Sequence, residues 1–419
     1  MLIREIYKFS LLCLTFLLWT QHAPAQQPNE NPLMRSDLME MQTLKNYGLN
    51  VSDGNLVYLL KTGHDKFEDL FKYVAKAEKF IHMEYFNYRN DSINSILIHL
   101  LHQKAQEGIE VRVMYDAFGN SSNNQPFSRA KHDSICALGI QLEKFDPLNF
   151  PWLTHIYPRD HRKIVVIDGK VAYTGGMNVA DYYIEGLKGI GPWRDMHRHI
   201  EGPAVIDIHK IFIKMWAKQT GQLLTGIRYL PPCEKKGNIR MAVIDREPNV
   251  TNRSIRQLYI SMLDNAQKNV KIVSPYFMPT ASLRKAIKNA VKRGVDVQIM
   301  LSEKSDVPMT PHVVHFWGRK MAKAGVKVYL YQTGFHHTKI MTVDDSFCTI
   351  GSSNLDARSL RYDYEINTAV FDKDITMQLV NMFEEDKKQS LILDDTKWEN
   401  KSAWHKFVGW FGHLLTPVM

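Results

Sequence analysis

Hydrophobic positions along the chain follow two spacings, one typical of helices and the other typical of strands. Phe67, Leu70, Phe71 and Val74 recur at the spacing of one helical face, and residues 80–88 follow as a short apolar strand. Similar pairs of helix and strand recur further along the chain. Helices that alternate with short apolar strands predict an α/β fold, whose parallel or mixed sheet is covered by helices on both faces.

The same succession of elements occurs twice. Gly108 ends a predicted helix and precedes an alternating strand, and Gly294 does the same 186 residues later. Gly139 and Gly325 are also separated by 186 residues. A constant offset over two separate matches indicates a duplication. It predicts two similar α/β domains around a pseudo-twofold axis, with a shared active site at their interface.

The first residues differ from the rest of the chain. Arg4 and Lys8 precede an apolar run at residues 9–19, and Ala23 and Ala25 flank a proline in the form of a signal-peptidase site. We therefore expect an exported protein on the periplasmic side, peripherally associated with the cell membrane; whether the signal peptide is cleaved or acts as an anchor stays open. The expected segments are a signal peptide at 1–25, an N-terminal tether at 26–50, a first domain at 51–230, a connection at 231–252, a second domain at 253–400 and a C-terminal amphipathic helix at 401–419.

The C-terminal segment has a one-sided apolar pattern. Six apolar residues fall on a single helical face, namely Trp404, Phe407, Val408, Phe411, Leu414 and Leu415. Lys401, His405 and Lys406 lie largely elsewhere. This pattern is typical of a helix that rests on an anionic membrane surface, and docking onto the protein's own core is the alternative.

Composition narrows the class of protein. The 419 residues are 44% hydrophobic and 23% charged, which fits neither a disordered chain nor a disulfide-stapled one. Lys and Arg outnumber Asp and Glu by 53 to 44, and the net charge of +9 favours anionic partners such as phospholipid head groups or nucleic acid. The 4 cysteines are far apart and have no metal-binding spacing, so we expect no metal and no other cofactor.

Two segments carry an unusual set of polar residues at matched positions. Residues 161–178 read HRKIVVIDGKVAYTGGMN and residues 337–354 read HTKIMTVDDSFCTIGSSN, with a constant offset of 176 residues. Positions i and i+2 of a strand face the same side, so each segment directs its imidazole and its ammonium group to one point. The matched polar residues are His161, Lys163, Asp168 and Asn178 in the first segment, and His337, Lys339, Asp344 and Asn354 in the second.

Two His, two Lys and two Asn around one point suit a phosphodiester. Lys and Asn donors can hold the non-bridging oxygens and stabilise the charge of a five-coordinate phosphorus. One His can attack phosphorus while the other protonates the leaving alkoxide. An attacking imidazole needs an acceptor on its other nitrogen, and Asp195 and Glu365 are the candidates. We expect Asp168 and Asp344, although part of the motif, to support the hairpins and the lysines.

These residues resemble the motifs of the phospholipase D superfamily. The repeated H-x-K-x4-D pattern, each followed by G-[GS]-x-N, is similar to that of enzymes that pass through a covalent phosphohistidine. Flanking runs, such as SPYFMP at 274–279 and GSSNLDARSL at 351–360, are similar to bacterial cardiolipin synthases. The resemblance implies two duplicated phospholipase D-like α/β/α sandwich domains, with His161 as the nucleophile and His337 as the acid and then the base.

The resemblance also implies a substrate and a reaction. Two phosphatidylglycerol molecules would give cardiolipin and glycerol at a membrane surface, through phosphatidyl transfer. Two alternatives stay open. One is an exported phospholipase D that hydrolyses phospholipids to phosphatidic acid, and the other is an exported phosphodiesterase or nuclease of the same superfamily, which would make nucleic acid the partner.

Overall fold

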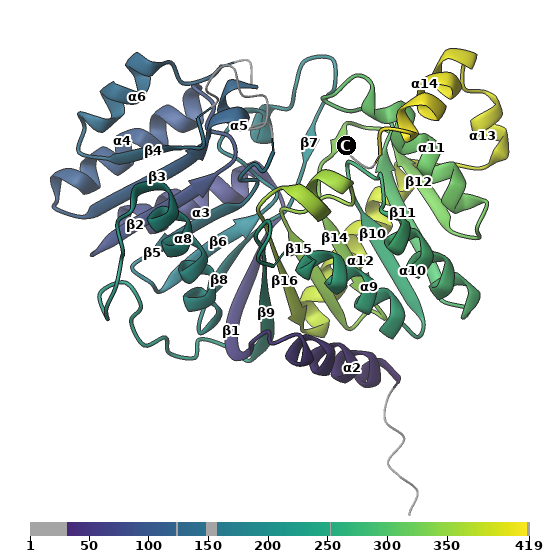
Figure 1. Ribbon diagram of the computed structural model, residues 1–419, viewed down its shortest axis with the longest axis horizontal. Coiled ribbons are helices and arrows are strands. Elements are labelled where there is room, and N and C mark those ends of the chain that lie inside the picture. Colours follow the sequence, from purple (N-terminus) through teal and green to yellow (C-terminus); the bar gives the residue numbers. More distant parts are fainter. Residues whose placement is uncertain (1–31, 123–124, 148–156, 252, 417–419) are drawn as a thin grey trace, which may run out of the picture.

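The structure, a computed structural model, describes residues 32–122, 125–147, 157–251 and 253–416. Two α/β halves lie side by side along one sheet (Figure 1). The predicted signal peptide lies outside the described residues. The first half contains β1 (Val51–Leu60), α3 (Gly63–Ala75), β2 (Phe80–Tyr85), α4 (Ser92–Gln106), β3 (Glu110–Asp116), α5 (Ala117–Ser121), α6 (Arg129–Cys136), β4 (Gln141–Phe145), β5 (Lys163–Ile167), β6 (Val171–Gly175), α7 (Tyr182–Glu185), β7 (Trp193–Arg194), β8 (His197–Glu201) and α8 (Ala204–Thr220).

The second half repeats this order and then adds a C-terminal extension. It contains β9 (Ile239–Arg246), α9 (Ser254–Asn265), β10 (Asn269–Val273), α10 (Ala281–Lys292), β11 (Asp296–Ser302), α11 (Thr310–Ala322), β12 (Lys327–Tyr331), β13 (Phe335–His336), β14 (Ile340–Val343), β15 (Phe347–Gly351), the π-helical turn η2 (Arg358–Tyr362), β16 (Glu365–Phe371), α12 (Lys373–Lys388), β17 (Ser390–Ile392), α13 (Asp395–Glu399) and α14 (Ala403–His413).

The strand order shows the duplication directly. Fifteen of the described strands form one sheet in the order β17-β12-β11-β10-β14-β15-β16-β9-β1-β8-β6-β5-β2-β3-β4, and β7 pairs with β13 in a separate two-stranded sheet. Reading outward from the antiparallel pair β1 and β9 gives the same succession in both directions, apart from the added β17. In each half three strands are parallel, and the hairpin that follows them runs antiparallel. The predicted duplicated α/β fold is therefore confirmed.

Helices cover both faces of the sheet, and the side-chain alternation of single strands shows it. In β5, Ile164 and Val166 belong to the core under α8 and α12, while Val165 and Ile167 belong to the core under α3 and α4. A third core lies under α9, α10 and α11. The α8 and α12 core contains residues of both halves, so the halves share buried apolar surface as well as a sheet.

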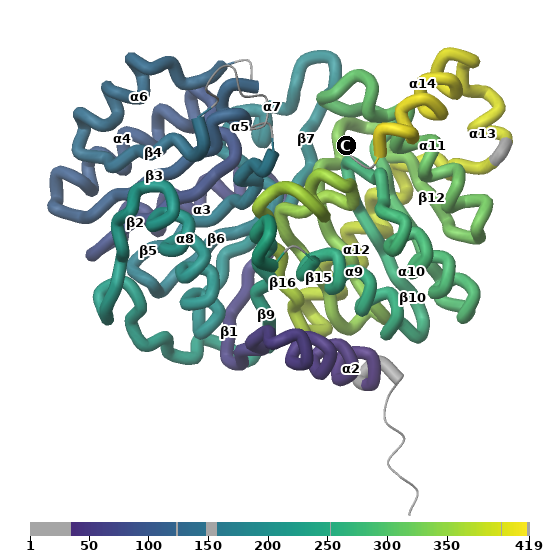
Figure 2. Tube along the Cα trace, viewed as in Figure 1, coloured from purple at the N-terminus to yellow at the C-terminus, as the bar shows by residue number. Residues whose placement is uncertain are grey.

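The expected N-terminal tether contains a helix, α2 (Pro32–Asn46). Figure 2 shows it passing beneath the second half before the chain enters β1 of the first half. Leu44 is buried in the second-half core, and the Glu40 carboxylate accepts hydrogen bonds from Ser261 and Asn265 of α9. The bonds of Glu40 to Ser261 and Asn265 thus attach this part of the expected tether to the other half, which periodicity does not reveal.

Candidate active site

Each motif histidine lies just before a central strand of its half. Lys163 is the first residue of β5, where it pairs opposite Tyr85 at the carboxyl end of β2, and β14 begins one residue after Lys339. The backbone N–H of His161 donates to Tyr364 O at 3.0 Å, and that of His337 donates to Arg194 O at 2.7 Å. Each histidine is therefore anchored by backbone of the other half.

The carboxylate partners also cross between the halves. His161 Nδ1 lies 2.9 Å from Glu365 Oε1, and His337 Nδ1 lies 2.6 Å from Asp195 Oδ2. Both carboxylates are buried. A carboxylate on Nδ1 fixes the orientation of the ring and reserves Nε2 for chemistry. The two acceptors proposed from the sequence thus lie on the two histidines, each across the domain interface.

Both imidazoles open into one cavity of about 600 Å³. Asn178 and Asn354 also line it, so the structure brings the histidines and asparagines of both motifs together. Aromatic rings surround the histidines, with centroid distances of 4.9 Å from Phe86 to His161 and 5.3 Å from Trp193 to His337. The further lining residues include Asn87, Arg89, Phe118, Ser122, Tyr157, Tyr182, Tyr276, Met278, Asp306, Val307, Thr310, Asp356, Arg358, Ser359 and Asp363.

The two lysines lie behind the rings and are buried. Lys163 Nζ donates to His161 O at 2.6 Å, and Lys339 Nζ donates to His337 O and lies 3.9 Å from Asp195 Oδ2. Burial lowers the pKa of Lys163 to about 7 and that of Lys339 to about 8. Two cations close to one site supply positive charge for an anionic substrate, and an anion would favour their charged forms.

The surroundings lower the pKa of both histidines, and that of His161 more than that of His337. Burial, followed by the charges of Lys163 and Lys339, lowers the pKa of His161 well below its usual value. Burial and Lys339 also lower the pKa of His337, against the opposing effect of Asp195. Burial raises the pKa of Asp195, but Lys339 and His337 outweigh it, and the pKa is lowered. A neutral imidazole is the form that can act as a nucleophile.

The asparagines and glycines at the motif ends fix the turn beside the histidines. Asn178 Oδ1 accepts the backbone N–H of Asn87 at 3.2 Å. Asn354 Oδ1 is buried and has no hydrogen-bond partner among the residues that the structure describes. A Cβ on Gly176 would collide with the carboxylate of Asp195, and one on Gly351 would collide with the side chain of Asn367. The glycines therefore permit the close approach on which the site is built.

The motif aspartates lie at the far ends of the hairpin strands, away from the two histidines. Asp168 follows β5, at the opposite end of the strand from His161. Its carboxylate accepts the backbone N–H groups of Glu78, Lys79 and Phe80 at 2.9, 2.7 and 3.0 Å. Asp344 makes the equivalent bonds to the loop before β10. A strand separates each aspartate from the reacting point, so its role is to fix the hairpin turn.

Comparison with known proteins agrees with this geometry. The family described as "Cardiolipin synthase, PLD-like domain" matches residues 70–186 and 259–387, one segment in each half. The chain belongs to this family. It is 33% identical to a cardiolipin synthase of Listeria monocytogenes over 90% of this chain and 78% of that one. It is 34% identical to the major cardiolipin synthase of Bacillus subtilis over 91% of this chain and 79% of that one.

A solved structure shares the architecture of this cardiolipin synthase family member. Phosphatidylserine synthase of Haemophilus influenzae superposes with a TM-score of 0.66 at 15% identity, covering 91% of this chain and all of that one. At this identity the likeness shows the fold alone.

The expectation of an exported, periplasmic-side protein is wrong. The relatives that align with nine-tenths of the chain are bacterial cardiolipin synthases, and their class is a better guide to location than the short apolar run at residues 9–19. That run lies outside the described residues. Among the helices that the structure describes, none has the length and apolarity needed to cross a bilayer.

Several cavity residues of this family member escaped the sequence analysis. Arg358 is paired with Asp363 and lies over the rings of Phe118 and Tyr157. Asp356 lies two residues before it and also lines the cavity. Both occur in the run GSSNLDARSL, which resembles cardiolipin synthases. The spacing of residues in this run does not indicate that η2 turns back over the site.

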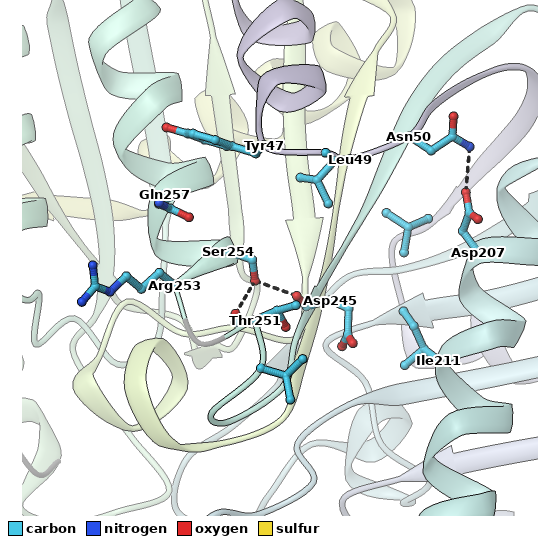
Figure 3. A pocket seen from close by; sticks show the side chains of 13 residues that line it. Tyr47, Leu49, Asn50, Asp207, Ile211, Asp245, Thr251, Arg253, Ser254 and Gln257 are labelled. Atoms are coloured by element: carbon cyan, nitrogen blue, oxygen red, sulfur yellow. Dashed lines mark hydrogen bonds between the residues drawn. The ribbon is translucent and has the colours of Figure 1, made fainter.

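A separate pocket lies between the loop after α2, α8 and the start of α9 (Figure 3). There Asn50 Nδ2 donates to Asp207 Oδ2 at 3.1 Å, and Ser254 Oγ donates to backbone oxygens of Asp245 and Thr251. It contains none of the motif residues. It is therefore distinct from the cavity of the histidines.

Proposed function

We propose that this protein transfers a phosphatidyl group from one phosphatidylglycerol to another, which yields cardiolipin and glycerol through a phosphohistidine. The observation that carries the proposal is the pair of imidazoles that face one cavity, each held at Nδ1 by a buried carboxylate of the opposite half. The names of the relatives supply the reaction class.

In the first step, Nε2 of His161 attacks the phosphorus of phosphatidylglycerol. The bond from phosphorus to the oxygen of the glycerol head group breaks, and His337 gives that oxygen a proton as glycerol leaves. The charge that builds on the non-bridging oxygens is stabilised by the cations Lys163 and Lys339 and by the amide of Asn178.

In the second step, the roles of proton donor and acceptor reverse. A hydroxyl of a second phosphatidylglycerol gives its proton to His337 and attacks phosphorus. The bond between phosphorus and His161 Nε2 breaks, cardiolipin forms, and both histidines return to their starting state.

The different carboxylates favour this assignment of the two histidines. Asp195, whose pKa is lowered, stays ionised and stabilises a proton on His337. Burial raises the pKa of Glu365, so its support for a charged His161 is weaker. An acid benefits from an anionic partner, whereas a nucleophile must start without a proton.

The walls of the cavity favour an alcohol over water as the acceptor. Phe86, Trp193 and Tyr276 place aromatic rings around the two imidazoles. Such walls exclude water from the phosphohistidine and contact the carbon skeleton of a lipid acceptor. Hydrolysis to phosphatidic acid is the competing outcome.

The test incubates the purified full chain with phosphatidylglycerol vesicles and follows the products by mass spectrometry, with and without EDTA. We expect cardiolipin and glycerol in equal amounts in both. Phosphatidic acid as the sole product would refute the synthase, and loss of activity in EDTA would refute chemistry by these side chains alone. His161→Ala and His337→Ala should each lower the rate on the order of 10³-fold or more. His99→Ala, an exposed histidine on α4, is the matched control and should leave it unchanged.

A further inference from the structure

The C-terminal helix α14 turns its large apolar side chains to solvent. Six of them are between 47% and 64% exposed. They lie along one side of the helix, and the rings of Phe407 and Phe411 stack on each other rather than on the body of the protein. The six residues of this exposed face are Trp404, Phe407, Trp410, Phe411, Leu414 and Leu415. A contiguous aromatic surface of this kind marks an interaction site.

The opposite side of α14 is the one that packs on the protein. Val408, Gly409 and Gly412 are buried against α11. A Cβ on Gly409 would lie 2.6 Å from the backbone oxygen of His312, and one on Gly412 would collide with Val313. The close approach needs glycine at both positions. The helix thus packs through its small residues and exposes its large apolar ones. A helix that stabilises a core does the opposite and buries its large apolar residues.

The helix on which α14 packs and the turn beside its C-terminal end both lead to the active-site cavity. Thr310, the first residue of α11, lines the cavity, and Val307 and Met309 beside it are about half exposed. At the other end, Leu414 lines a hollow together with Ala357, the neighbour of the cavity residue Arg358. Figure 1 shows α14 on the same edge of the molecule as α5 and β7, while α2 lies on the opposite edge.

Cations accompany this apolar face. Arg284 and Arg361 line the hollow beside Leu414. Arg361 is exposed, whereas Arg284 lies over the ring of Trp317 at 4.3 Å and donates to the backbone oxygen of Pro279. Within the described residues, no carboxylate forms an ion pair with Arg284 or Arg361. Arginines that no carboxylate neutralises, beside exposed apolar side chains, suit a surface that carries phosphates.

We propose that the exposed face of α14, with Arg284 and Arg361 beside it, docks the protein on the surface of an anionic phospholipid bilayer and places the cavity mouth at the head groups. The aromatic rings enter the boundary between head groups and acyl chains, and the arginines contact lipid phosphates. This inference rests on the proposed function, since a lipid substrate is what makes a bilayer the occupant. A second copy of the chain is the competing occupant.

The test measures flotation with phosphatidylglycerol vesicles and with vesicles of phosphatidylcholine alone. The full chain should bind the anionic vesicles more tightly, and added salt should weaken the binding. The triple variant W404Q/F407Q/W410Q should bind at least about tenfold more weakly. The matched control L38Q/M39Q/Y47Q removes exposed apolar side chains on and beside α2, at the opposite edge, and should bind like the wild type. Unchanged binding of the first variant would overturn the proposal.

A second measurement does not depend on the variants remaining folded. Lipids brominated near the head of the acyl chain should quench the tryptophan fluorescence of the wild-type chain on anionic vesicles, because Trp404 and Trp410 would lie at that depth. No quenching of bound protein would overturn the proposal. If the wild type is a dimer, and the triple variant is a monomer that still binds vesicles, the face would be assigned to a second copy instead.

A soluble substrate separates this inference from the proposed function. Short-chain phosphatidylglycerol below its micelle concentration reports the chemistry without a surface. A triple variant that is slow on vesicles and normal on the dissolved lipid supports docking. Wild-type chain that binds vesicles but transfers nothing in either form refutes the proposed function alone. A triple variant as fast as an active wild type on vesicles refutes docking alone.

Discussion

The two imidazoles of the site differ in how readily the carboxylate that each one touches ionises. Asp195 has a lowered pKa because Lys339 and His337 outweigh its burial, whereas burial raises the pKa of Glu365. An ionised carboxylate stabilises a protonated imidazole and raises its pKa. Two histidines of which one attacks and the other donates a proton in the first step need this kind of asymmetry. Because the two motifs are alike, the asymmetry comes from their surroundings.

Asp195→Asn should therefore shift the pH dependence of phosphatidyl transfer. The neutral amide removes the charge that holds a proton on His337, so the pKa of His337 falls further. The rate declines at high pH when His337 loses its proton, and this alkaline limb of kcat/KM should move to lower pH.

The matched control is Asp69→Asn. Asp69 Oδ2 lies 2.6 Å from His199 Nδ1, the same distance as in the Asp195 pair, but away from the cavity. It should leave the pH profile in place. An alkaline limb that stays where it was in Asp195→Asn would contradict the role of His337 as the acid.

Loss of the Asp168 carboxylate should affect the stability of the protein rather than its chemistry. Asp168→Ala leaves three backbone N–H groups without their acceptor, and we expect the free energy of unfolding to fall by about 2–4 kcal/mol. The transfer rate per folded molecule should stay near that of the wild type. Urea unfolding and the rate in the absence of urea measure the two effects. A loss of rate comparable to that of His161→Ala would show that Asp168 takes part in the chemistry.

The residue types of the site could be predicted from the sequence, but their pairing could not. A strand places His161 and Lys163 on one side by period alone, and the constant offset supplies their counterparts. Asp195 and Glu365 were also within reach as carboxylates close to the motifs. Each carboxylate contacts the histidine of the opposite half because of the pseudo-twofold axis. This axis brings His161 and Glu365 together although they are 204 positions apart in the sequence.

At the scale of elements, the contact between α14 and α11 contains a stack of histidines. The ring of His405 lies 4.3 Å from that of His312, and its Nε2 lies 3.3 Å from His315 Nδ1. Burial, followed by the neighbouring histidines and Lys401, lowers the pKa of His405 to about 3, against the opposing charge of Glu303. Burial lowers the pKa of His315 to about 4, and Glu303 opposes it there as well.

Acid should therefore loosen α14. The docked state holds both histidines below their usual pKa of about 6.5, so protonation favours the undocked helix. The contribution of the two neutral histidines to the stability of the docked helix is fully present above about pH 6.5 and is lost as the pH falls toward 4. Hydrogen exchange of residues 403–413, corrected for intrinsic rates, should show less protection at pH 5 than at pH 7.5.

His405→Phe is the control for this titration. Phenylalanine keeps a ring against His312 but cannot gain a proton, so the pH dependence of protection in α14 should become weaker. Equal dependence in the variant and the wild type would remove His405 from the explanation.

The sequence predicted the existence of α14 and most of its apolar face, but not the side on which it packs. Hydrophobic periodicity left open whether Phe407 and Phe411 face a membrane or the protein's own core, whereas the structure exposes them and buries Gly409 and Gly412. Glycine carries no hydrophobic signal, and only the distance to α11 shows that it is required. The same limit applies to α2, whose contact with α9 depends on a buried Glu40.

At the scale of the whole molecule, the two halves are joined in a way that separate domains are not. β1 and β9 pair antiparallel through Val51 with Ala242 and Ser52 with Met241, so one sheet crosses the junction. The core under α8 and α12 mixes residues of both halves, among them Phe212 and Phe383. The proposed active site depends on the same junction, because each motif histidine takes its carboxylate from across it.

We therefore expect the two halves to unfold together. Scanning calorimetry should show one transition whose calorimetric and van't Hoff enthalpies agree, since neither half can expose its share of the common core alone. Asp344→Ala, a change in the second half, should lower the unfolding midpoint by a few degrees. Hydrogen exchange in β3 of the first half should show the same decrease in its midpoint. Transfer activity should disappear within that single transition. Two resolved transitions, or a first half that keeps its midpoint in Asp344→Ala, would show that the continuous sheet does not couple the halves.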